Sequence, residues 1–279
     1  MASWYLAQAS TYAADIDNLV LLIGVIVGVW FIAAELVLFW LILRFRARPG
    51  VAGQYIAGED KREKRWVSYP HYAVLVFDVV ILVFALRVWS HIKITAPTPE
   101  ETVRVVGQQW AWTFVHAGPD GALDTPDDIR TVDDLYVQVN KVYRFELHSR
   151  DVLHSFSVPV FRLKQDAIPG RMIAGWFTPT VTGTFDIQCA EICGLGHGYM
   201  PGRIHVQTAA ERTAWLNERE ADRLAGRAIS PTPVALESPV PAAVVAVEHH
   251  AGGHATSSGT GGPVTSGVEG PTLSGVEGR

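Results

Sequence analysis

Two long apolar stretches dominate the first third of the chain. Glu35 is the single charged residue within residues 19–43, and Asp78 lies inside a second apolar stretch at residues 71–92. At a rise of ~1.5 Å per residue, each stretch is long enough to cross a hydrocarbon core of ~30 Å. The pattern therefore predicts two transmembrane helices, at residues 19–43 and 71–92, within an anchor that covers residues 1–93.

The segment between these stretches carries more basic than acidic side chains: Arg44, Arg46, Arg48, Lys61, Arg62, Lys64 and Arg65 against Glu59, Asp60 and Glu63. Such an excess is typical of cytoplasmic loops. We therefore expect a multi-pass protein of a bacterial-type cell (inner) membrane, with both termini and everything after residue 93 on the extracytoplasmic, periplasmic side. The first 18 residues lack a basic region, which favours a retained N-terminus over a cleaved signal peptide.

Glu35 and Asp78 need an explanation, because ionisable groups inside a membrane are costly and usually face a protein interior or a water-filled path. One interpretation is a proton route or a polar contact with a partner helix. The other is a protonated carboxyl group that is hydrogen-bonded between helices. Both predict a larger membrane partner in addition to lipid.

After residue 93 the pattern changes to that of an all-β domain, expected at residues 94–208. Tyr143, Phe145 and Leu147 alternate with Arg144 and Glu146. Short stretches of this kind, separated by Gly, Pro and Thr, predict a sandwich or barrel. The aspartate-rich insertion at residues 118–128 is interpreted as a solvated loop; a calcium site is the alternative, but the regular ligand spacing of such a site is missing.

The chain after the β-domain divides into two parts. Residues 209–228 are predicted to form one helix, and the Pro, Ala, Gly and Ser-rich residues 229–279 are predicted to be a disordered tail. His249, His250 and His254 lie in this tail, where adventitious metal binding is the alternative to no function. The fold class expected for the whole chain is an α+β membrane protein.

Charge and cysteine content narrow the function. The formal net charge is −5 and no basic stretch is interleaved with aromatic residues, which argues against nucleic-acid binding. The only two cysteines lie in CAEICGLGHGYM at residues 189–200. A disulfide between Cys189 and Cys193 is one interpretation, but it leaves His197 and Met200 of the same stretch unexplained.

A copper site explains this stretch better. Thiolate and thioether ligands favour copper over zinc, and a single-copper blue site uses one Cys, two His and a weak axial Met. The second cysteine suits two copper ions that share two bridging thiolates, each ion with one imidazole and one weak donor. His154 of DVLHSFSVP, 35 residues before Cys189, supplies the second imidazole, and Met200 and the main-chain carbonyl of Glu191 supply the weak donors. His116, His148 and His205 fit no such pattern and are interpreted as surface or strand residues.

These motifs together resemble one family. C-A-E-I-C-G-x-x-H-x-x-M, DVLHSFSVP followed by LKQDAIPGR at residues 163–171, and GQQWAWTF at residues 107–114 are similar to the signature of cytochrome c oxidase subunit II. The resemblance extends over roughly residues 15–225. It implies a cupredoxin-like barrel with a dinuclear copper centre whose ligands are His154, Cys189, the Glu191 carbonyl, Cys193, His197 and Met200.

The resemblance also implies partners and further roles. The Glu191 side chain would bind magnesium at the interface with the catalytic subunit. Trp110 would receive electrons from cytochrome c; the alternative role for this residue is core packing. Asp133 and Asp151 would help to dock cytochrome c; the alternative for them is a solvated acidic rim. The chain would pass electrons to haem in oxidase subunit I, where oxygen is reduced to water and protons are translocated, with subunit III as a further partner.

Three rival functions remain. A quinol oxidase subunit II shares the architecture but lacks the copper ligands, all of which are present here. A copper-bearing subunit of a nitric oxide reductase relative would use the same centre with a different partner subunit. A membrane-anchored copper chaperone or free electron carrier would need neither Glu191 nor a two-helix anchor with buried acids.

Overall fold

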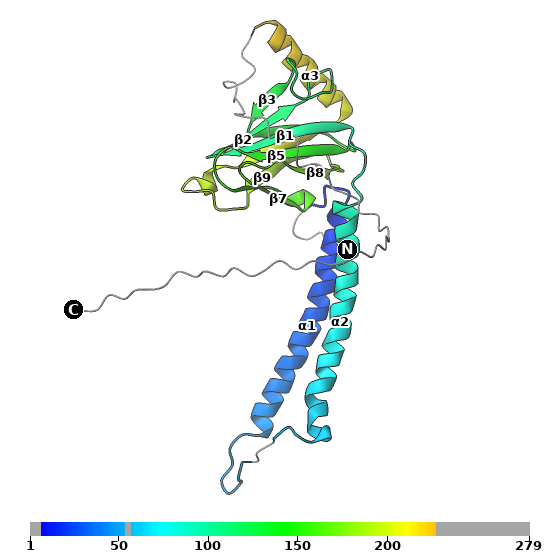
Figure 1. The fold of residues 1–279 in the computed structure, drawn as a ribbon, viewed down its shortest axis with the longest axis vertical. Coiled ribbons are helices and arrows are strands. Elements are labelled where there is room, and N and C mark those ends of the chain that lie inside the picture. The colour runs from blue at the N-terminus through cyan, green and yellow to red at the C-terminus, as the bar shows by residue number, and fades with distance from the viewer. Residues whose placement is uncertain (1–6, 54–56, 227–279) are drawn as a thin grey trace, which may run out of the picture. The chain divides into compact units, whose positions relative to one another are not determined.

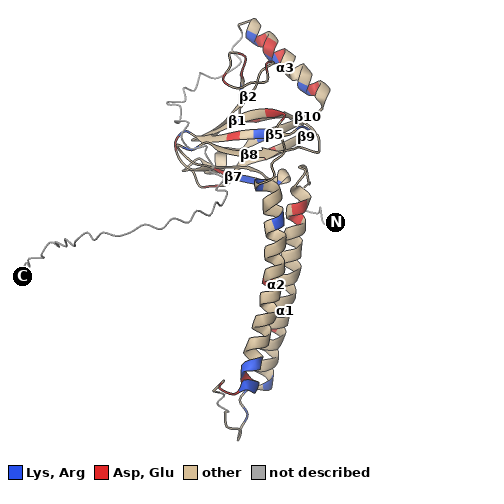
Figure 2. Cartoon of the chain, turned by 45° about the vertical axis from the view of Figure 1, so that its right-hand side comes forward, with Lys and Arg blue, Asp and Glu red and all other residues tan. Residues whose placement is uncertain are grey.

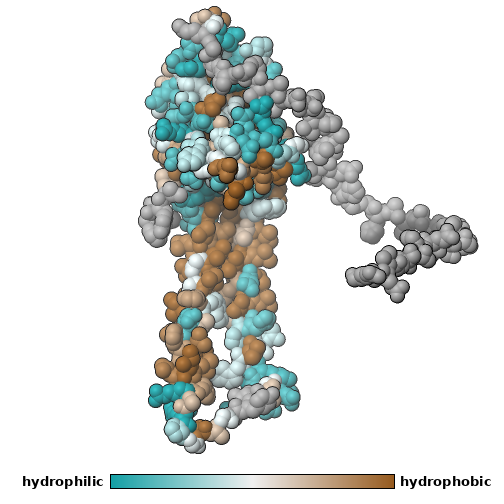
Figure 3. Space-filling model, turned by 90° about the vertical axis from the view of Figure 1, so that its left-hand side faces the viewer, coloured by the Kyte–Doolittle hydropathy of each residue, from teal (hydrophilic) through white to brown (hydrophobic). Residues whose placement is uncertain are grey.

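The computed structural model describes residues 7–53 and 57–226. The two helices of the first third are α1 (Ala13–Arg44) and α2 (Lys61–Lys93). They lie side by side and most of their large apolar side chains are exposed, as the brown surface in Figure 3 illustrates. Both are long and apolar enough to cross a membrane. The predicted tail at residues 229–279, with its histidines, lies outside the described residues.

Both helices are longer than the predicted apolar stretches. α1 begins at Ala13 and α2 at Lys61, where polar residues continue the helix. Apolar patterning marks the part of a helix suited to hydrocarbon, whereas the backbone hydrogen bonds continue through the polar ends. Figure 2 shows charged residues gathered towards the ends of the two helices, with tan residues between them.

Ten strands follow the helices (Figure 1). They are β1 (Glu101–Gln108), β2 (Ala111–His116), β3 (Ile129–Val132), β4 (Asp134–Gln138), β5 (Tyr143–Ser149), β6 (His154–Val158), β7 (Leu163–Ala167), β8 (Ile173–Phe177), β9 (Gly183–Cys189) and β10 (Gly202–Gln207). They form two five-stranded sheets, in the orders β3-β2-β1-β5-β8 and β4-β10-β9-β6-β7. The pairs β1–β5 and β10–β4 are parallel, and the other pairs are antiparallel. The predicted order of a two-helix hairpin followed by an all-β domain is confirmed.

Alternating side chains build the core between the sheets. Val103, Phe145 and Leu147 come from the first sheet, and Phe156 and Ile187 from the second, all with at most 1% of their surface exposed. Period-two patterning turns alternate residues inward, which explains why the sequence showed the strands clearly. The helix α3 (Ala209–Leu224) packs against this domain through the buried Trp215, and a capping box at Thr208 and Glu211 fixes its start.

The residues before α1 also join the β-domain. Ala9 and Tyr12 belong to its buried core, and the Ala9 amide donates to the Val160 carbonyl at 2.9 Å. The guanidinium of Arg162 binds the Asp17 carboxylate at 2.7 Å. The predicted boundary between residues 93 and 94 assigned the N-terminal segment to the membrane anchor alone. The contact with the β-domain was not predicted, because the N-terminal segment carries no strand pattern of its own.

Candidate metal centre

The Cys189–Met200 stretch is a loop between two neighbouring strands. β9 ends at Cys189 beside Phe156 of β6, and β10 begins two residues after Met200. The Ala190 amide donates to the Ser155 carbonyl at 3.0 Å, which holds the loop start against the strand that carries His154. A short 3₁₀ turn, η2 (His197–Tyr199), then brings the loop back.

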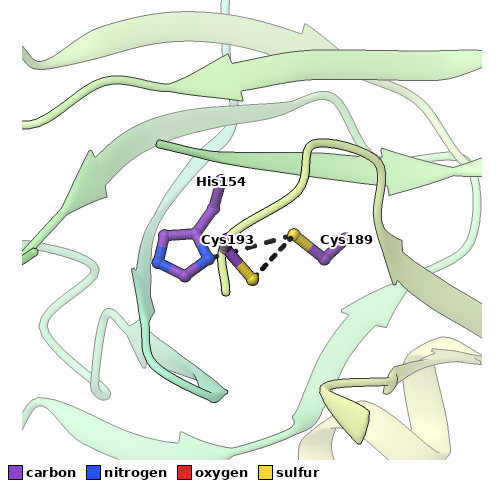
Figure 4. A group of neighbouring side chains, drawn as sticks. All are labelled: His154, Cys189 and Cys193. Carbon is purple, nitrogen blue, oxygen red and sulfur yellow. Dashed lines mark hydrogen bonds between the residues drawn. The ribbon is translucent and has the colours of Figure 1, made fainter. Parts of the chain in front are cut away.

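The loop brings the sulfur atoms of Cys189 and Cys193 together with His154. Cys189 Sγ lies 3.9 Å from Cys193 Sγ and 3.9 Å from His154 Nδ1 (Figure 4). A disulfide has an S–S distance of ~2.05 Å, and both cysteines are free thiols in the structure. Within the described part of the chain, His154, Cys189 and Cys193 are the one group of His, Cys, Asp or Glu side chains close enough together to hold a metal ion.

The remaining predicted donors complete a paired arrangement. The Glu191 carbonyl lies 3.2 Å from Cys189 Sγ. His197 Nδ1 lies 3.6 Å and Met200 Sδ 3.3 Å from Cys193 Sγ. Each sulfur therefore has one imidazole nitrogen and one weaker donor beside it.

The site is buried on the side of the domain core. His154, Cys193 and Met200 have at most 2% of their surface exposed, and Trp112 packs edge-on against His154 with a ring-centroid distance of 6.0 Å. Burial, followed by the neighbouring Cys189, raises the pKa of the Cys193 thiol to about 11. A metal ion that binds the Cys193 thiolate must therefore displace the thiol proton, which makes metal binding depend on pH.

Asp151 orients His154, a role that the sequence did not reveal. Asp151 Oδ1 lies 2.9 Å from His154 Nε2, which leaves Nδ1 directed toward the cysteines. The other oxygen accepts from the Gln109 amide at 2.7 Å. Burial alone would raise the pKa of Asp151, but its hydrogen bonds from Gln109, His154 and Val152 outweigh this and lower it. A carboxylate on the second nitrogen of a ligating histidine is a common support of metal sites, so the Asp-x-x-His spacing was an available signal.

Trp110 lies on the outer side of the loop and is 41% exposed. Its Nε1 donates to the Cys193 carbonyl at 3.3 Å, and Gln109 Nε2 donates to the same carbonyl at 2.7 Å. A Cβ added at Gly196 would lie 2.3 Å from Cδ2 of Trp110, so the indole packs directly on the loop backbone. Trp112 is fully buried in the core. Gln109 is part of the GQQWAWTF motif, but no sequence pattern assigned it a role of its own.

The side chain of Glu191 points to a different neighbour from its carbonyl. Its Oε1 accepts from Lys164 Nζ at 2.9 Å, and Lys164 also binds Asp166 at 3.1 Å. The side chains of Lys164 and Glu191 are 51% and 37% exposed. The carboxylate is therefore available at the surface of the site, held by an exposed ion pair of low energy.

Asp133 is tied into the backbone next to the site. Its Oδ1 accepts from the Trp112 amide at 2.8 Å, and its carbonyl accepts from the Arg203 amide at 2.7 Å. Burial raises the pKa of Asp133. These contacts give Asp133 a structural role between β3 and β4; its predicted docking role, like that of Asp151, stays a prediction.

The other sequence features lie away from the metal centre. His116 is a buried strand residue, and His205 Nε2 lies 2.7 Å from Asp134.

In the insertion, Asp124 binds Arg104 at 2.6 Å and Asp127 accepts from Thr125 at 2.6 Å. These aspartates are engaged in hydrogen bonds and an ion pair that fold the loop, in line with the interpretation as a solvated loop. Glu35 and Asp78 have no hydrogen-bond or ion-pair partner among the described residues.

Comparison with known proteins identifies the family. The alternative cytochrome c oxidase subunit 2 of Bradyrhizobium diazoefficiens is 31% identical over 240 residues, which cover 78% of this chain and 84% of the relative. The chain belongs to the cytochrome c oxidase subunit 2 family. The family model for the periplasmic domain of cytochrome c oxidase subunit II matches residues 101–208.

One further relative and one solved structure are also similar to this chain. Cytochrome c oxidase subunit 2 of Cereibacter sphaeroides is 28% identical over 241 residues, 76% of this chain and 78% of the relative. The solved periplasmic domain of subunit II from Bradyrhizobium japonicum is 30% identical, covers 46% of this chain and 98% of that chain, and has a TM-score of 0.40. The resemblance drawn from the motifs is confirmed. The chain is a membrane-anchored oxidase subunit with a cupredoxin-like domain, and this copper-binding family fits the soft donor set of the site.

Proposed function

We propose that the chain is the electron-entry subunit of a cytochrome c oxidase and that its loop holds a dinuclear copper centre. The observation that carries the proposal is the pairing of donors. Cys189 Sγ has His154 Nδ1 and the Glu191 carbonyl beside it, and Cys193 Sγ has His197 Nδ1 and Met200 Sδ, all within 3.9 Å. A single-copper blue site would need only one of the two thiolates.

The protein scaffold suits electron transfer. Two copper ions held by these donors would supply a one-electron acceptor. The chain holds the donors on rigid elements: His154 begins a strand, Cys189 ends another, and Asp151 keeps the imidazole in one orientation. Burial of His154, Cys193 and Met200 excludes water from one side of the centre.

Electrons would enter at Trp110. This indole is exposed on one edge and donates a hydrogen bond to the Cys193 carbonyl, so a donor protein that touches the ring is one hydrogen bond away from a ligand residue. The donor is proposed to be cytochrome c. Asp133 and Asp151 are proposed to contribute to a negative rim that steers a basic donor, an effect that salt screens.

The chain would pass electrons to haem in oxidase subunit I, where oxygen would be reduced to water with proton translocation. Subunit III is proposed as a further partner. The exposed apolar helices and the unpartnered Glu35 and Asp78 of the described chain support a partner in the membrane. The basic segment between the helices supports a cytoplasmic position for that loop. The termini and the copper domain, residues 94–208, would then lie on the periplasmic side.

The Glu191 carboxylate is proposed to bind magnesium at the interface with subunit I. Mg²⁺ prefers carboxylate oxygen and usually keeps several water ligands. The exposed position of Glu191 beside Lys164 supports a carboxylate that can exchange its partner when a second subunit covers the site.

Electron paramagnetic resonance of the copper-loaded full chain in detergent tests the dinuclear centre. The expected spectrum has seven hyperfine lines, because one unpaired electron is shared by two copper nuclei. Cys189→Ser removes one bridge and should replace this spectrum with a four-line signal or abolish it. His205→Gln, which removes an imidazole outside the loop, is the matched control. A four-line signal from the wild type, or one copper per chain, would sink the proposal.

Stopped-flow reduction of the assembled oxidase by cytochrome c tests the entry route. Trp110→Phe should slow electron entry and leave the copper spectrum intact, because the ring loses its hydrogen bond to Cys193 while the ligands stay in place. Trp66→Phe, at another exposed indole, should change neither quantity. Equal rates for Trp110→Phe and the wild type would remove Trp110 from the route.

A further inference from the structure

A cavity of about 320 Å³ lies where the outer end of α2 meets the β-domain. α2 ends at Lys93, one residue after its apolar stretch, and the connection to β1 passes along the cavity at Ala96, Pro97 and Pro99. The end of an apolar span is the level at which lipid headgroups meet water. The cavity therefore opens at the membrane surface, outside the metal centre.

The cavity wall is apolar and aromatic. Ile92, Phe145, Leu163 and Trp176 contribute to it, together with Tyr12 from the segment before α1. Trp176 Nε1 donates to the Ile92 carbonyl at 2.8 Å, and the Tyr12 and Trp176 rings meet edge-on with centroids 5.2 Å apart. Tryptophan and tyrosine concentrate at membrane–water interfaces. These contacts hold the cavity wall in place between the end of α2 and β8.

Two basic side chains line the same cavity without a carboxylate to neutralise them. Lys93 Nζ donates to the neutral amide of Gln165 at 2.9 Å. Arg144 is exposed, and its guanidinium has no hydrogen-bond or ion-pair partner within residues 7–53 and 57–226. None of the described residues that line the cavity is acidic. The site thus combines an apolar wall with two positive charges.

A neighbouring groove between α1 and α2 differs in this respect. It is lined by Arg87 and His91, but also by Asp15, whose Oδ2 lies 3.2 Å from His91 Nδ1. That groove carries its own counter-charge, so it offers less attraction to an anion.

We propose that the cavity binds one anionic phospholipid of the outer leaflet. The phosphate binds Lys93 and Arg144, and the first part of an acyl chain lies against Ile92, Leu163 and Trp176. A volume near the lower end of ligand pockets, which span roughly 300–1,000 Å³, suits part of a lipid rather than a whole one. The bound lipid would fasten the β-domain to the membrane surface at the point where α2 leaves it.

Native mass spectrometry tests this site. The full chain in detergent is titrated with phosphatidylglycerol, phosphatidylcholine or inorganic phosphate. The wild type should retain one phosphatidylglycerol more tightly than phosphatidylcholine, and phosphate alone should not compete. Each basic residue near a membrane surface contributes about fivefold to the binding of anionic lipid. Lys93→Gln and Arg144→Gln together should therefore weaken phosphatidylglycerol binding about 25-fold and leave phosphatidylcholine binding unchanged.

Two further variants separate charge from shape. Arg203→Gln removes an exposed arginine on β10 that does not line the cavity, and it should not change binding. Ala174→Phe narrows the cavity from an exposed strand position; it should weaken both lipids about tenfold, as overpacking a filled site does, while the copper spectrum stays intact.

The same variants in the assembled oxidase complete the test. The purified complex should contain one phosphatidylglycerol per copy of this chain that is lost in the Lys93→Gln/Arg144→Gln variant. Equal phosphatidylglycerol binding by that variant and the wild type would overturn the proposal. So would competition by phosphate alone, or a complex in which a partner subunit fills the cavity and no lipid is retained.

Discussion

The membrane hairpin and the β-domain use apolar side chains in opposite ways. In the β-domain, Trp112, Phe114 and Phe156 have none of their surface exposed. In α1 and α2, Phe39, Trp40 and most other large apolar side chains are about half exposed or more. Exposure on this scale is favourable in a membrane but not in water.

This difference shows which part of the chain is complete by itself. The β-domain, together with the segment before α1, buries its core and brings all six proposed copper donors together without help from another chain. The hairpin forms two helices but leaves their surfaces, and the carboxylates of Glu35 and Asp78, to lipid or to another subunit. Lipid or another subunit therefore determines the environment of the hairpin, whereas the β-domain determines that of the candidate metal centre.

The largest effect is expected for Trp112→Ala in the core of the β-domain. Trp112 packs against His154 and Phe156 at ring-centroid distances of 6.0 and 5.7 Å. Its truncation leaves a cavity and should lower the free energy of unfolding of the β-domain by roughly 3–5 kcal/mol. Denaturant unfolding of the full chain in detergent, followed by near-UV circular dichroism, measures this. A loss below about 1 kcal/mol would contradict the idea of a self-contained core.

The second test concerns the attachment of α3 to the same domain. Arg212 is buried, its Nη2 lies 2.6 Å from Glu101 Oε1, and its guanidinium lies over the Trp215 ring. Arg212→Leu leaves a buried carboxylate with Lys141 as its remaining cation and should destabilise the domain by about 3 kcal/mol. Arg223→Leu breaks the exposed pair with Glu220, and its effect on stability should be much smaller than that of Arg212→Leu, because water screens an exposed ion pair. Hydrogen exchange of the α3 amides measures the effect of each substitution. Equal effects of Arg212→Leu and Arg223→Leu would show that burial of the ion pair does not matter for the attachment of α3.

A third test uses pH, because the buried His116 should make acid unfold the β-domain. Burial, and secondarily Arg212, hold the pKa of His116 well below its usual value. Below pH ~6.5 the unfolded chain binds a proton at His116 more readily than the folded chain does, so the free energy of unfolding falls as pH falls. As the pH falls below ~6.5, the wild type should lose more unfolding free energy than His116→Gln. Parallel pH profiles for the two proteins would remove His116 as the cause.

The smallest effect is expected in the hairpin. Leu38 lies in α1 with 49% of its surface exposed. Leu38→Ala should change the unfolding free energy of the β-domain by less than about 0.5 kcal/mol, because it creates no cavity in a packed core. Its effect should be seen in assembly with the catalytic subunit, measured by co-purification. A large change in the stability of the isolated chain would show that the hairpin supports the domain more than its exposed surface suggests.

Much of this protein follows from the sequence alone. Apolar stretches of membrane-spanning length and period-two alternation are local patterns, and they are sufficient to predict the hairpin and the all-β domain. The spacing of Cys189, Cys193, His197 and Met200 is also local, since one loop must place its own donors together. That is why the amino-acid sequence was sufficient to identify the family and to propose the loop ligands.

The tertiary structure decided what depends on residues far apart in the chain. His154 reaches the loop only because β6 pairs with β9, and Gln109 reaches the Cys193 carbonyl from the turn between β1 and β2 of the other sheet. Asp151, a predicted docking residue, is also the group that orients His154, because its neighbours are set by the fold. The same holds for the cavity between α2 and β8, where Lys93 and Arg144, which local patterning does not connect, line one site. Such contacts arise from strand pairing and packing, which single-residue patterns do not encode.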